Sequence, residues 1–529
     1  MPVAQHLPAP FIFLSNGELI YFWDYRNNDA RLVNSFFSRR DLERLVEMRS
    51  SRKPLATIAI PEYYTRQGET RQVRPYQREA MQAMDHAIEL GKRKFLIELP
   101  TGTGKTDLIA LQLKRLIEAG YAEKILFLVD REQLAKQALE TIQDILNHYG
   151  SYWLKPNVIR QEQQITVCLL QTMISRYREF TSGYFDVVIA DECHRSIYGI
   201  WQAALTYFDA LHLGLTATPA AYIERNTFEF YHCQNQQPDF AYSIEYAFKK
   251  GYLVPYKFAT GITEIISEGA ELDEVYYDPT GFERKWTNEE TNRLMMAEFD
   301  KLAWESYQEL APGQKIGPGK SIVFALTKNH AARLARYLNE LHPECRGNYA
   351  AVITSELNNA DDLIRQFKYE DYPQVAVSVD MLNTGFDCRE VLHLVLCRPV
   401  RSPILYQQIR GRGTRTAPHI DKRKFVIYDF FRNRDYFNDS DTDIFVGRGQ
   451  GNLGKTSHQQ RTFSQKELIE LGLKDRWQER VSYVEVGTEG ERVDKRDYVT
   501  HWEETIKNAI NDANCHDEFS LAWNSHCED

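Results

Sequence analysis

One segment organises this chain: Phe95-Leu96-Ile97-Glu98-Leu99-Pro100-Thr101-Gly102-Thr103-Gly104-Lys105-Thr106. Its apolar first half, residues 95–99, predicts a buried strand, and residues 107–118 predict a helix. The glycines between them let the backbone curl with its N–H groups pointing inward, and the helix start adds the positive end of a dipole. Such a strand–loop–helix unit predicts a site that binds the phosphates of a nucleotide.

Two residues at the helix start complete this pattern. Lys105 is placed to reach the β- and γ-phosphates, and the Thr106 hydroxyl is placed to ligate Mg²⁺. The full G-x-x-x-x-G-K-T pattern has a glycine where Leu99 stands. For this segment taken alone, a chance Gly/Thr turn before a helix remains the alternative.

Composition limits the class of protein. A length of 529 residues exceeds one hydrophobic core and predicts three or four units, and 26% charged residues is ordinary for a globular protein. With a mean hydropathy of -0.49, no long apolar run and no basic start, we expect neither a membrane span nor a secretory signal. The 8 cysteines form no C-x-x-C pair, which favours a cytoplasmic protein. The net charge of -10 argues against bulk nucleic-acid coating but not against a local basic cleft.

Strand-like and helix-like segments alternate twice, which predicts an α/β fold of two parallel sheets. In the first alternation we expect strands at 95–99, 125–129, 165–170, 187–191 and 213–216, and helices at 75–90, 105–119, 131–148 and 171–178. In the second we expect strands at 321–325, 350–354, 374–379, 392–397 and 424–428, and helices at 328–341, 361–368 and 402–412. We further expect a hairpin at Asn16-Gly17, a linker at 49–54 and an irregular stretch at 222–318.

A pair of carboxylates, Asp191-Glu192, follows the apolar run 185–190. Ligands of open parallel sheets bind beyond the carboxyl ends of the strands. We expect Asp191 to hold Mg²⁺ and Glu192 to polarise the attacking water. Such a pair is also common as a helix N-cap. The phosphate-binding loop upstream favours the catalytic interpretation.

Two later motifs have a functional and a plain interpretation. The first is Leu215-Thr216-Ala217-Thr218-Pro219. It either senses the phosphate state of the nucleotide and passes it to the second half of the chain, or it is an ordinary turn that ends a strand. The segment 407–415 carries arginines at 410, 412 and 415. Arg412 and Arg415 would share a helix face, and across a cleft from a γ-phosphate they would meet the requirement for arginine fingers. The alternative is a solvated charged face.

Taken in order, these motifs resemble those of superfamily 2 helicases and translocases. The set comprises the phosphate-binding loop, Asp-Glu-Cys-His at 191–194, Thr-Ala-Thr at 216–218, Thr-Gly-Phe-Asp at 384–387 and Gln-x-x-Gly-Arg-x-x-Arg at 408–415. The resemblance spans about residues 71–430. It implies two tandem RecA-like domains with ATP in the cleft between them and nucleic acid across their top.

The resemblance also implies roles for individual residues. Arg74 and Gln77 resemble the adenine-reading element, and Asp191 and Glu192 the Mg²⁺ and catalytic-base pair. The ATP-binding loop is carried by Thr101, Gly102, Thr103, Gly104, Lys105 and Thr106. Gly385 and Asp387 resemble nucleotide contacts, and Thr384 a DNA-backbone contact. Gln408, Arg412 and Arg415 resemble γ-phosphate sensors that act from the second domain.

Residues 10–17, 191–199 and 242–247 resemble, more narrowly, the restriction (R, motor) subunit of type I restriction-modification enzymes. That family translocates double-stranded DNA at the expense of ATP, works with methylase and specificity subunits, and cuts with a nuclease domain placed before the motor. We expect this chain to begin about where that nuclease ends and to lack nuclease activity. Its Glu283-Arg284-Lys285 triplet lies between the two α/β domains instead.

The expected division is an N-terminal adaptor at 1–70, RecA-like domains at 71–250 and 251–435, and a helical C-terminal region at 436–529. Two other functions stay open. One is a strand-separating superfamily 2 helicase on DNA or RNA, outside restriction. The other is a binding platform that closes on ATP without turnover.

Overall fold

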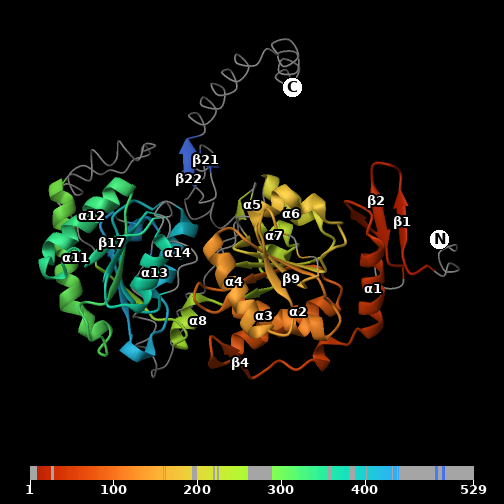
Figure 1. The fold of residues 1–529 in the computed structure, drawn as a ribbon, viewed down its shortest axis with the longest axis horizontal. Helices are drawn as coiled ribbons and strands as arrows, with labels where there is room; N and C mark the ends of the chain where they lie inside the picture. The colour runs from red at the N-terminus through yellow and green to blue at the C-terminus, as the bar shows by residue number, and fades with distance from the viewer. Residues whose placement is uncertain are drawn as a thin grey trace, which may run out of the picture.

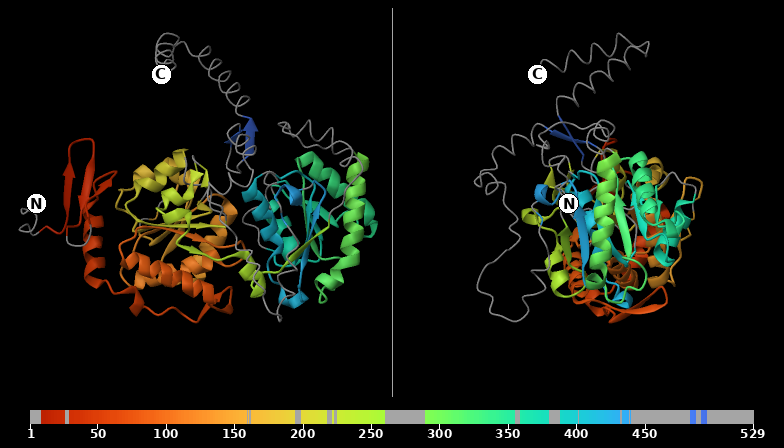
Figure 2. Two further views of the ribbon diagram at one scale, coloured as in Figure 1. Left: turned by 180° about the vertical axis from the view of Figure 1, so that it is seen from behind. Right: turned by 90° about the vertical axis from the view of Figure 1, so that its left-hand side faces the viewer.

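The computed structural model describes the two α/β domains and the N-terminal segment of the chain. The described residues are 9–25, 29–158, 160, 162–193, 199–217, 221–222, 225–259, 289–354, 359–379, 388–400, 402–431, 433–437, 439, 483–486 and 491–494. In Figure 1 the N-terminal sheet, the first α/β domain and the second α/β domain follow one another along the long axis, and Figure 2 shows the same order from behind.

The first domain is built on a 7-stranded parallel sheet with the order β14-β6-β11-β10-β7-β9-β8. Its strands are β6 (Lys94–Glu98), β7 (Ile125–Val129), β8 (Ser151–Leu154), β9 (Ile165–Leu169), β10 (Val187–Asp191), β11 (Leu211–Thr216) and β14 (Phe240–Ala241). Its helices are α2 (Pro75–Glu89), α3 (Lys105–Glu118), α4 (Glu132–Ile145), α5 (Leu170–Arg176), α6 (Gly199–Tyr207) and α7 (Thr227–Phe230). A short antiparallel pair joins β12 (Ala221–Tyr222) to β13 (Arg225–Asn226).

Successive side chains of each strand point to opposite faces of the sheet, so the first domain has one hydrophobic core on each face. Phe95 and Ile97 pack with α2, α3 and α4 on one face of the sheet, whereas Leu96 packs with α5 and α6 on the other. Figure 1 shows α2 and α3 on one side of the sheet and α5 and α6 on the other. The strands and helices predicted here are confirmed to within a few residues.

The second domain has a 6-stranded parallel sheet with the order β15-β20-β19-β16-β18-β17. Its strands are β15 (Tyr256–Ala259), β16 (Lys320–Phe324), β17 (Ala350–Val352), β18 (Val375–Ser378), β19 (Val391–Leu396) and β20 (Phe425–Asp429). Its helices are α11 (Glu289–Leu310), α12 (Lys328–Leu341), α13 (Ala360–Tyr369), α14 (Pro403–Gly413) and α15 (Asn433–Tyr436). Helices α11 and α12 cover one face, and α13, α14 and the connecting helix α8 (Ile244–Lys249) cover the other.

The irregular stretch expected at 222–318 is wrong in its described part. It contains α8, the edge strand β15 and the 22-residue helix α11. Met295, Phe299 and Ala303 of α11 are fully buried and recur every four residues, which is the period of a helix face packed on a sheet. Charged residues between them concealed this period. Residues 260–288, which include the Glu283-Arg284-Lys285 triplet, lie outside the described residues.

The N-terminal segment forms the predicted hairpin and then a helix against the first domain. It comprises β1 (Ile12–Ser15), β2 (Ile20–Trp23), β3 (Arg31–Val33), α1 (Arg39–Ser51) and a second hairpin of β4 (Tyr63–Arg66) and β5 (Glu69–Gln72). The linker predicted at 49–54 is wrong for its first half, because Arg49 lies in the last turn of α1 and pairs with the buried Asp24.

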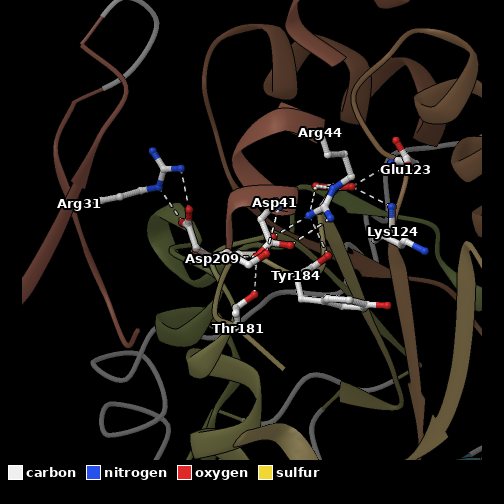
Figure 3. Close-up of polar contacts among 11 residues, drawn as sticks. Arg31, Asp41, Arg44, Glu123, Lys124, Thr181, Tyr184 and Asp209 are labelled. Carbon is white, nitrogen blue, oxygen red and sulfur yellow. Dashed lines mark hydrogen bonds and ion pairs between the residues drawn. The ribbon is translucent and has the colours of Figure 1, made fainter. Parts of the chain in front are cut away.

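Buried ionic contacts attach this segment to the first domain (Figure 3). Arg44 donates to the backbone oxygens of Gly183 and Tyr184 at 2.7 and 2.9 Å. It also pairs with Asp186, 3.3 Å away. Arg31 binds Asp209 through two hydrogen bonds of 2.6 Å. Because a buried charge is tolerated only with such partners, the segment is an integral layer of the domain.

Little of the C-terminal region is described. The helical region expected at 436–529 is wrong at residues 483–486 and 491–494, where β21 (Tyr483–Val486) and β22 (Glu491–Asp494) form an antiparallel pair. Almost all of the remaining residues there lie outside the described part. Among the helices that the structure describes, none has the length and apolar sequence needed to cross a membrane.

Candidate nucleotide-binding site

The loop between β6 and α3 has the backbone that phosphate binding requires. Gly102 and Gly104 have φ angles of +87° and +79°, in the left-handed region that favours glycine. A Cβ on Gly104 would lie 3.1 Å from the Nε2 atom of Gln77. The Thr103 hydroxyl donates to the Pro100 oxygen at 2.6 Å and closes the turn.

The structure explains why this loop has no glycine at position 99. The Leu99 N–H donates to the Thr216 oxygen at 3.0 Å, which continues the pairing of β6 with β11. Its side chain is fully buried in the core below the sheet. The chain is still strand-like at this point, so a side chain is accommodated and contributes to packing.

Lys105 and the two carboxylates after β10 come together at the carboxyl edge of the sheet. The Lys105 Nζ atom lies 3.4 Å from Glu192 Oε1 and 3.3 Å from the Leu99 oxygen. Glu192 has a φ of +48°, rare for a residue other than glycine, and its N–H donates to Asp191 Oδ1 at 3.0 Å. This turn directs Glu192 to Lys105 instead of along the strand.

Asp191 is the strongly perturbed acid of this edge. Burial and, to a smaller extent, the Glu192 carboxylate raise its pKa to about 7, against the opposing effect of the Lys105 ammonium. A cation beside Asp191 would favour its charged form. Thr106, in the first turn of α3, adds a hydroxyl, and such oxygen donors suit Mg²⁺, which keeps phosphates and waters as its other ligands. These residues therefore fit the expected Mg²⁺ site.

The adenine-side residues contact the phosphate-binding loop. Gln77 is 1% exposed; its Oε1 accepts from the Arg74 N–H at 3.0 Å and its Nε2 donates to the Gly104 oxygen at 3.3 Å. Tyr76 and Arg74 both donate to the Thr103 oxygen, at 2.5 and 3.4 Å. The structure thus places Arg74 and Gln77 beside the loop. The contact of Gln77 with a base stays a prediction.

Three aromatic residues of this site were not predicted. Tyr242 stacks on Tyr76 with ring centroids 4.2 Å apart, and the Arg74 guanidinium lies 5.1 Å from the Tyr252 ring centroid. Tyr64, in the β4–β5 hairpin, donates to Asp107 Oδ2 at 2.9 Å and so ties the hairpin to the start of α3. Tyr242 opens the segment 242–247 that resembles the restriction subunit, but that resemblance assigned it no role at the nucleotide, and neither Tyr64 nor Tyr252 belongs to a motif.

The second domain reaches the loop through α14. A Cβ on Gly411 would lie 2.6 Å from Thr101 Cβ, and a Cβ on Gly102 would lie 3.4 Å from Arg415 Cγ. Arg415 therefore lies against the phosphate-binding loop of the other domain. Its Nη1 atom donates to the Gly411 oxygen at 3.2 Å.

Arg412 and Gln408 are buried in the same helix. Arg412 is 4% exposed and its Nε donates to the Gln408 oxygen at 3.2 Å. Gln408 is 3% exposed, and among the residues that the structure describes neither polar atom of its amide finds a hydrogen-bond partner. With 3.6 residues per turn, Gln408 shares a face of α14 with Gly411, which touches the loop. A buried amide without a partner fits a site that receives a polar ligand.

Other predicted residues lie outside the described residues. These are Thr384, Gly385 and Asp387, together with His194 and Thr218 of the neighbouring motifs. The roles assigned to them stay predictions.

Comparisons with known proteins agree with this arrangement. Residues 70–221 match the family model "Type III restriction enzyme, res subunit", and residues 304–417 match "Helicase conserved C-terminal domain". The chain is 26% identical over 409 residues to the type I restriction enzyme EcoKI endonuclease subunit of Escherichia coli strain K12, covering 68% of this chain and 34% of that protein. It is 26% identical over 480 residues to the EcoAI endonuclease subunit of Escherichia coli, covering 83% and 57%. The chain thus spans about a third to just over half of these curated relatives.

A solved structure is similar along most of the chain. The fragment structure of a putative HsdR subunit of a type I restriction enzyme from Vibrio vulnificus YJ016 has a TM-score of 0.56 and 25% identity, covering 83% of this chain and 79% of that one. With two parallel-sheet domains, a phosphate-binding loop at their junction and a helicase C-terminal match in the second domain, the chain resembles the superfamily 2 helicase-type ATPases, which have two RecA-like domains. Within that class, it resembles the endonuclease (R) subunits of type I restriction enzymes.

Proposed function

We propose that this chain hydrolyses ATP between its two RecA-like domains and uses the reaction to move along double-stranded DNA, as the motor portion of a type I restriction enzyme. The observation that carries the proposal is the contact of α14 with the phosphate-binding loop, where Arg415 lies against Gly102. An arginine supplied by a second domain to the phosphates of the first is an arrangement that accelerates hydrolysis of a γ-phosphate by stabilising the charge of the transition state.

The residues of the first domain bind the nucleotide and handle the proton. Lys105 places its positive charge on the β- and γ-phosphates, in exchange for its pair with Glu192. Glu192, released from that pair, accepts the proton of the attacking water. Mg²⁺, when bound by Thr106 and Asp191, would neutralise negative charge on the phosphate oxygens.

The second domain acts on the transition state. Negative charge spreads over the oxygens of the transferred phosphoryl group, and a guanidinium at Arg415 stabilises it there. Because Arg415 reaches this group only while α14 touches the loop, turnover requires the closed domains. Release of phosphate removes the charge that attracts Arg415, so the domains separate, and repeated closing and opening is the movement that we propose to drive translocation.

Double-stranded DNA is the proposed track, and methylase and specificity subunits are the proposed partners. Both rest on the likeness to type I endonuclease subunits. A net charge of -10 means that DNA would bind at local surfaces of the motor. We also propose the division of the motor near residue 250, since the first sheet ends with β14 at Ala241 and the second begins with β15 at Tyr256.

The test is an ATPase assay with duplex DNA, single-stranded DNA and RNA side by side, joined to displacement of a third strand from a DNA triplex. We expect duplex DNA to stimulate turnover most and the third strand to be displaced with little unwinding. Stronger stimulation by single-stranded DNA or RNA would indicate a strand-separating helicase. If ATP turnover stays at background with duplex DNA, single-stranded DNA and RNA alike, the chain is a binding platform that closes on ATP without hydrolysing it.

A further inference from the structure

A buried polar cluster lies behind α14. Its centre is the Asp439 carboxylate, which accepts from the Tyr256 hydroxyl at 2.9 Å and from the Tyr406 hydroxyl at 3.0 Å. Arg410 Nη1 donates both to this carboxylate and to the Tyr256 hydroxyl, the latter at 2.7 Å. We call these four residues the Asp439 cluster.

Aromatic rings shield this cluster from water. The Arg410 and Asp439 side chains are 9% and 12% exposed. The guanidinium lies 5.5 Å from the Tyr256 ring centroid and 5.3 Å from that of Tyr406, which stacks on Phe437 at 4.3 Å. Burial raises the pKa of both tyrosines, so their hydroxyls stay protonated and act as donors. In such surroundings hydrogen bonds to a charged group are strong and directional.

The cluster joins three parts of the chain that are distant in sequence. Tyr256 begins β15, Tyr406 and Arg410 belong to α14, and Asp439 follows α15 at the exit of the second domain. The segment just before β15 also contacts the C-terminal end of α14, because the Val254 N–H donates to the Thr414 oxygen at 2.7 Å. Helix α14 is thus held at both ends from within its own domain.

The cluster and the nucleotide loop meet different faces of α14. With 3.6 residues per turn, Gly411, which touches Thr101, lies about 100° around the helix from Arg410 and about 140° from Tyr406. Because packed elements are stiff, a change behind the helix alters the place of Arg415 in front of it. A buried ion pair adds little stability compared with apolar side chains in the same place. This favours the interpretation that the pair of Arg410 and Asp439 fixes the position of α14.

We infer that the Asp439 cluster is a positioning device: it holds α14 so that Arg415 reaches the transferred phosphoryl group. The inference rests on the proposed function. By this inference the positioning residues are Asp439, Tyr256, Tyr406 and Arg410. The C-terminal end of the second domain, where Asp439 lies, then affects the rate of ATP hydrolysis.

The experiment compares Asp439→Asn with the unchanged chain, in the presence of saturating duplex DNA. We expect kcat to fall about tenfold or more and the KM for ATP to change by less than about twofold, because only transition-state stabilisation is lost. Affinity for ADP with aluminium fluoride, which mimics the transferred phosphoryl group, should fall by the same factor as kcat. Tyr256→Phe and Tyr406→Phe, which keep the rings and remove one hydroxyl each, test the same point if Asp439→Asn folds poorly.

A second comparison separates positioning from stability. In an Arg415→Ala background, measured by single turnover, Asp439→Asn should cost less than about twofold, since the residue it positions is already gone. The matched control is Asp300→Asn in α11. This carboxylate of the same domain is 14% exposed and accepts from His342 Nε2 and the Tyr349 hydroxyl, both at 2.9 Å. The control should lower the melting temperature and leave kcat unchanged.

Three results would overturn the inference. One is an unchanged kcat in the Asp439→Asn and tyrosine variants. Another is an equal loss from Asp439→Asn with and without Arg415, which would refute positioning and leave the proposed function intact. The third is an Arg415→Ala variant with the turnover of the unchanged chain, which would refute both.

Discussion

Gly411→Ala tests the contact between the two domains with a single methyl group. Gly411 lies inside α14, where alanine is favoured over glycine by about 1 kcal/mol. The second domain by itself should therefore be as stable as before, or more so. The cost falls at the junction, where the new Cβ would meet Thr101 Cβ at 2.6 Å, Cγ2 at 2.9 Å and Oγ1 at 3.1 Å.

The size of the effect follows from this overlap. Carbon atoms pack at about 3.5–4.0 Å, so α14 and the loop must separate by about 1 Å. A displacement of about 1 Å at a catalytic group costs about 10²-fold in rate. We therefore expect kcat for ATP hydrolysis to fall about 10²-fold. The KM for ATP should change far less, because Lys105 and the loop glycines stay in place.

The measurement is steady-state ATPase activity with duplex DNA, beside thermal melting of the same preparations. A Thr101→Gly change removes all three opposing atoms, so the double variant should recover activity relative to Gly411→Ala. An unchanged kcat in Gly411→Ala, with an unchanged melting temperature, would refute the contact as a feature of the hydrolysing state.

Three further predictions concern the first domain. Lys105→Ala should abolish turnover by removing the positive charge on the β- and γ-phosphates, as a phosphate-release assay would show; substantial residual turnover would contradict that role. Glu192→Gln should retain binding of ATP and duplex DNA, measured by filter binding or fluorescence, but not hydrolyse; retained hydrolysis would exclude Glu192 as the base. Burial raises the pKa of Glu98 from 4.5 to about 7, with Lys105 opposing the rise. The folded chain then binds a proton that the unfolded chain releases, so the Glu98 contribution to stability is lost as pH rises from about 4.5 to 7 and stays lost above it. Because glutamine does not titrate, the Glu98→Gln variant should not lose stability over this range. Its free energy of unfolding, measured with denaturant, should rise relative to that of the unchanged chain by about 3 kcal/mol between pH 4.5 and pH 8. A difference between the two chains that does not vary with pH would show that Glu98 is not protonated in the folded chain.

Local sequence determined the order of the motifs and most strands and helices of both sheets, with exceptions that include the edge strands β8, β14 and β15 and the helices α6 and α11. Buried strands such as 125–129 and 187–191 are continuous apolar runs, because both faces of a parallel sheet are covered. The phosphate-binding loop is encoded within a few residues, since a left-handed backbone at Gly102 and Gly104 is a local requirement. These features depend on neighbours in sequence, so they could be predicted from it.

Only the tertiary structure decided which distant residues meet. Nothing in the spacing of 222–318 showed that α11 packs on the second sheet, because a helix that buries one face reveals its period only when its partner is known. The contact of Gly411 with Thr101 and the convergence of three chain segments on Asp439 join residues far apart in sequence. Such contacts depend on how two domains and a returning chain pack, and local sequence carries no record of that packing.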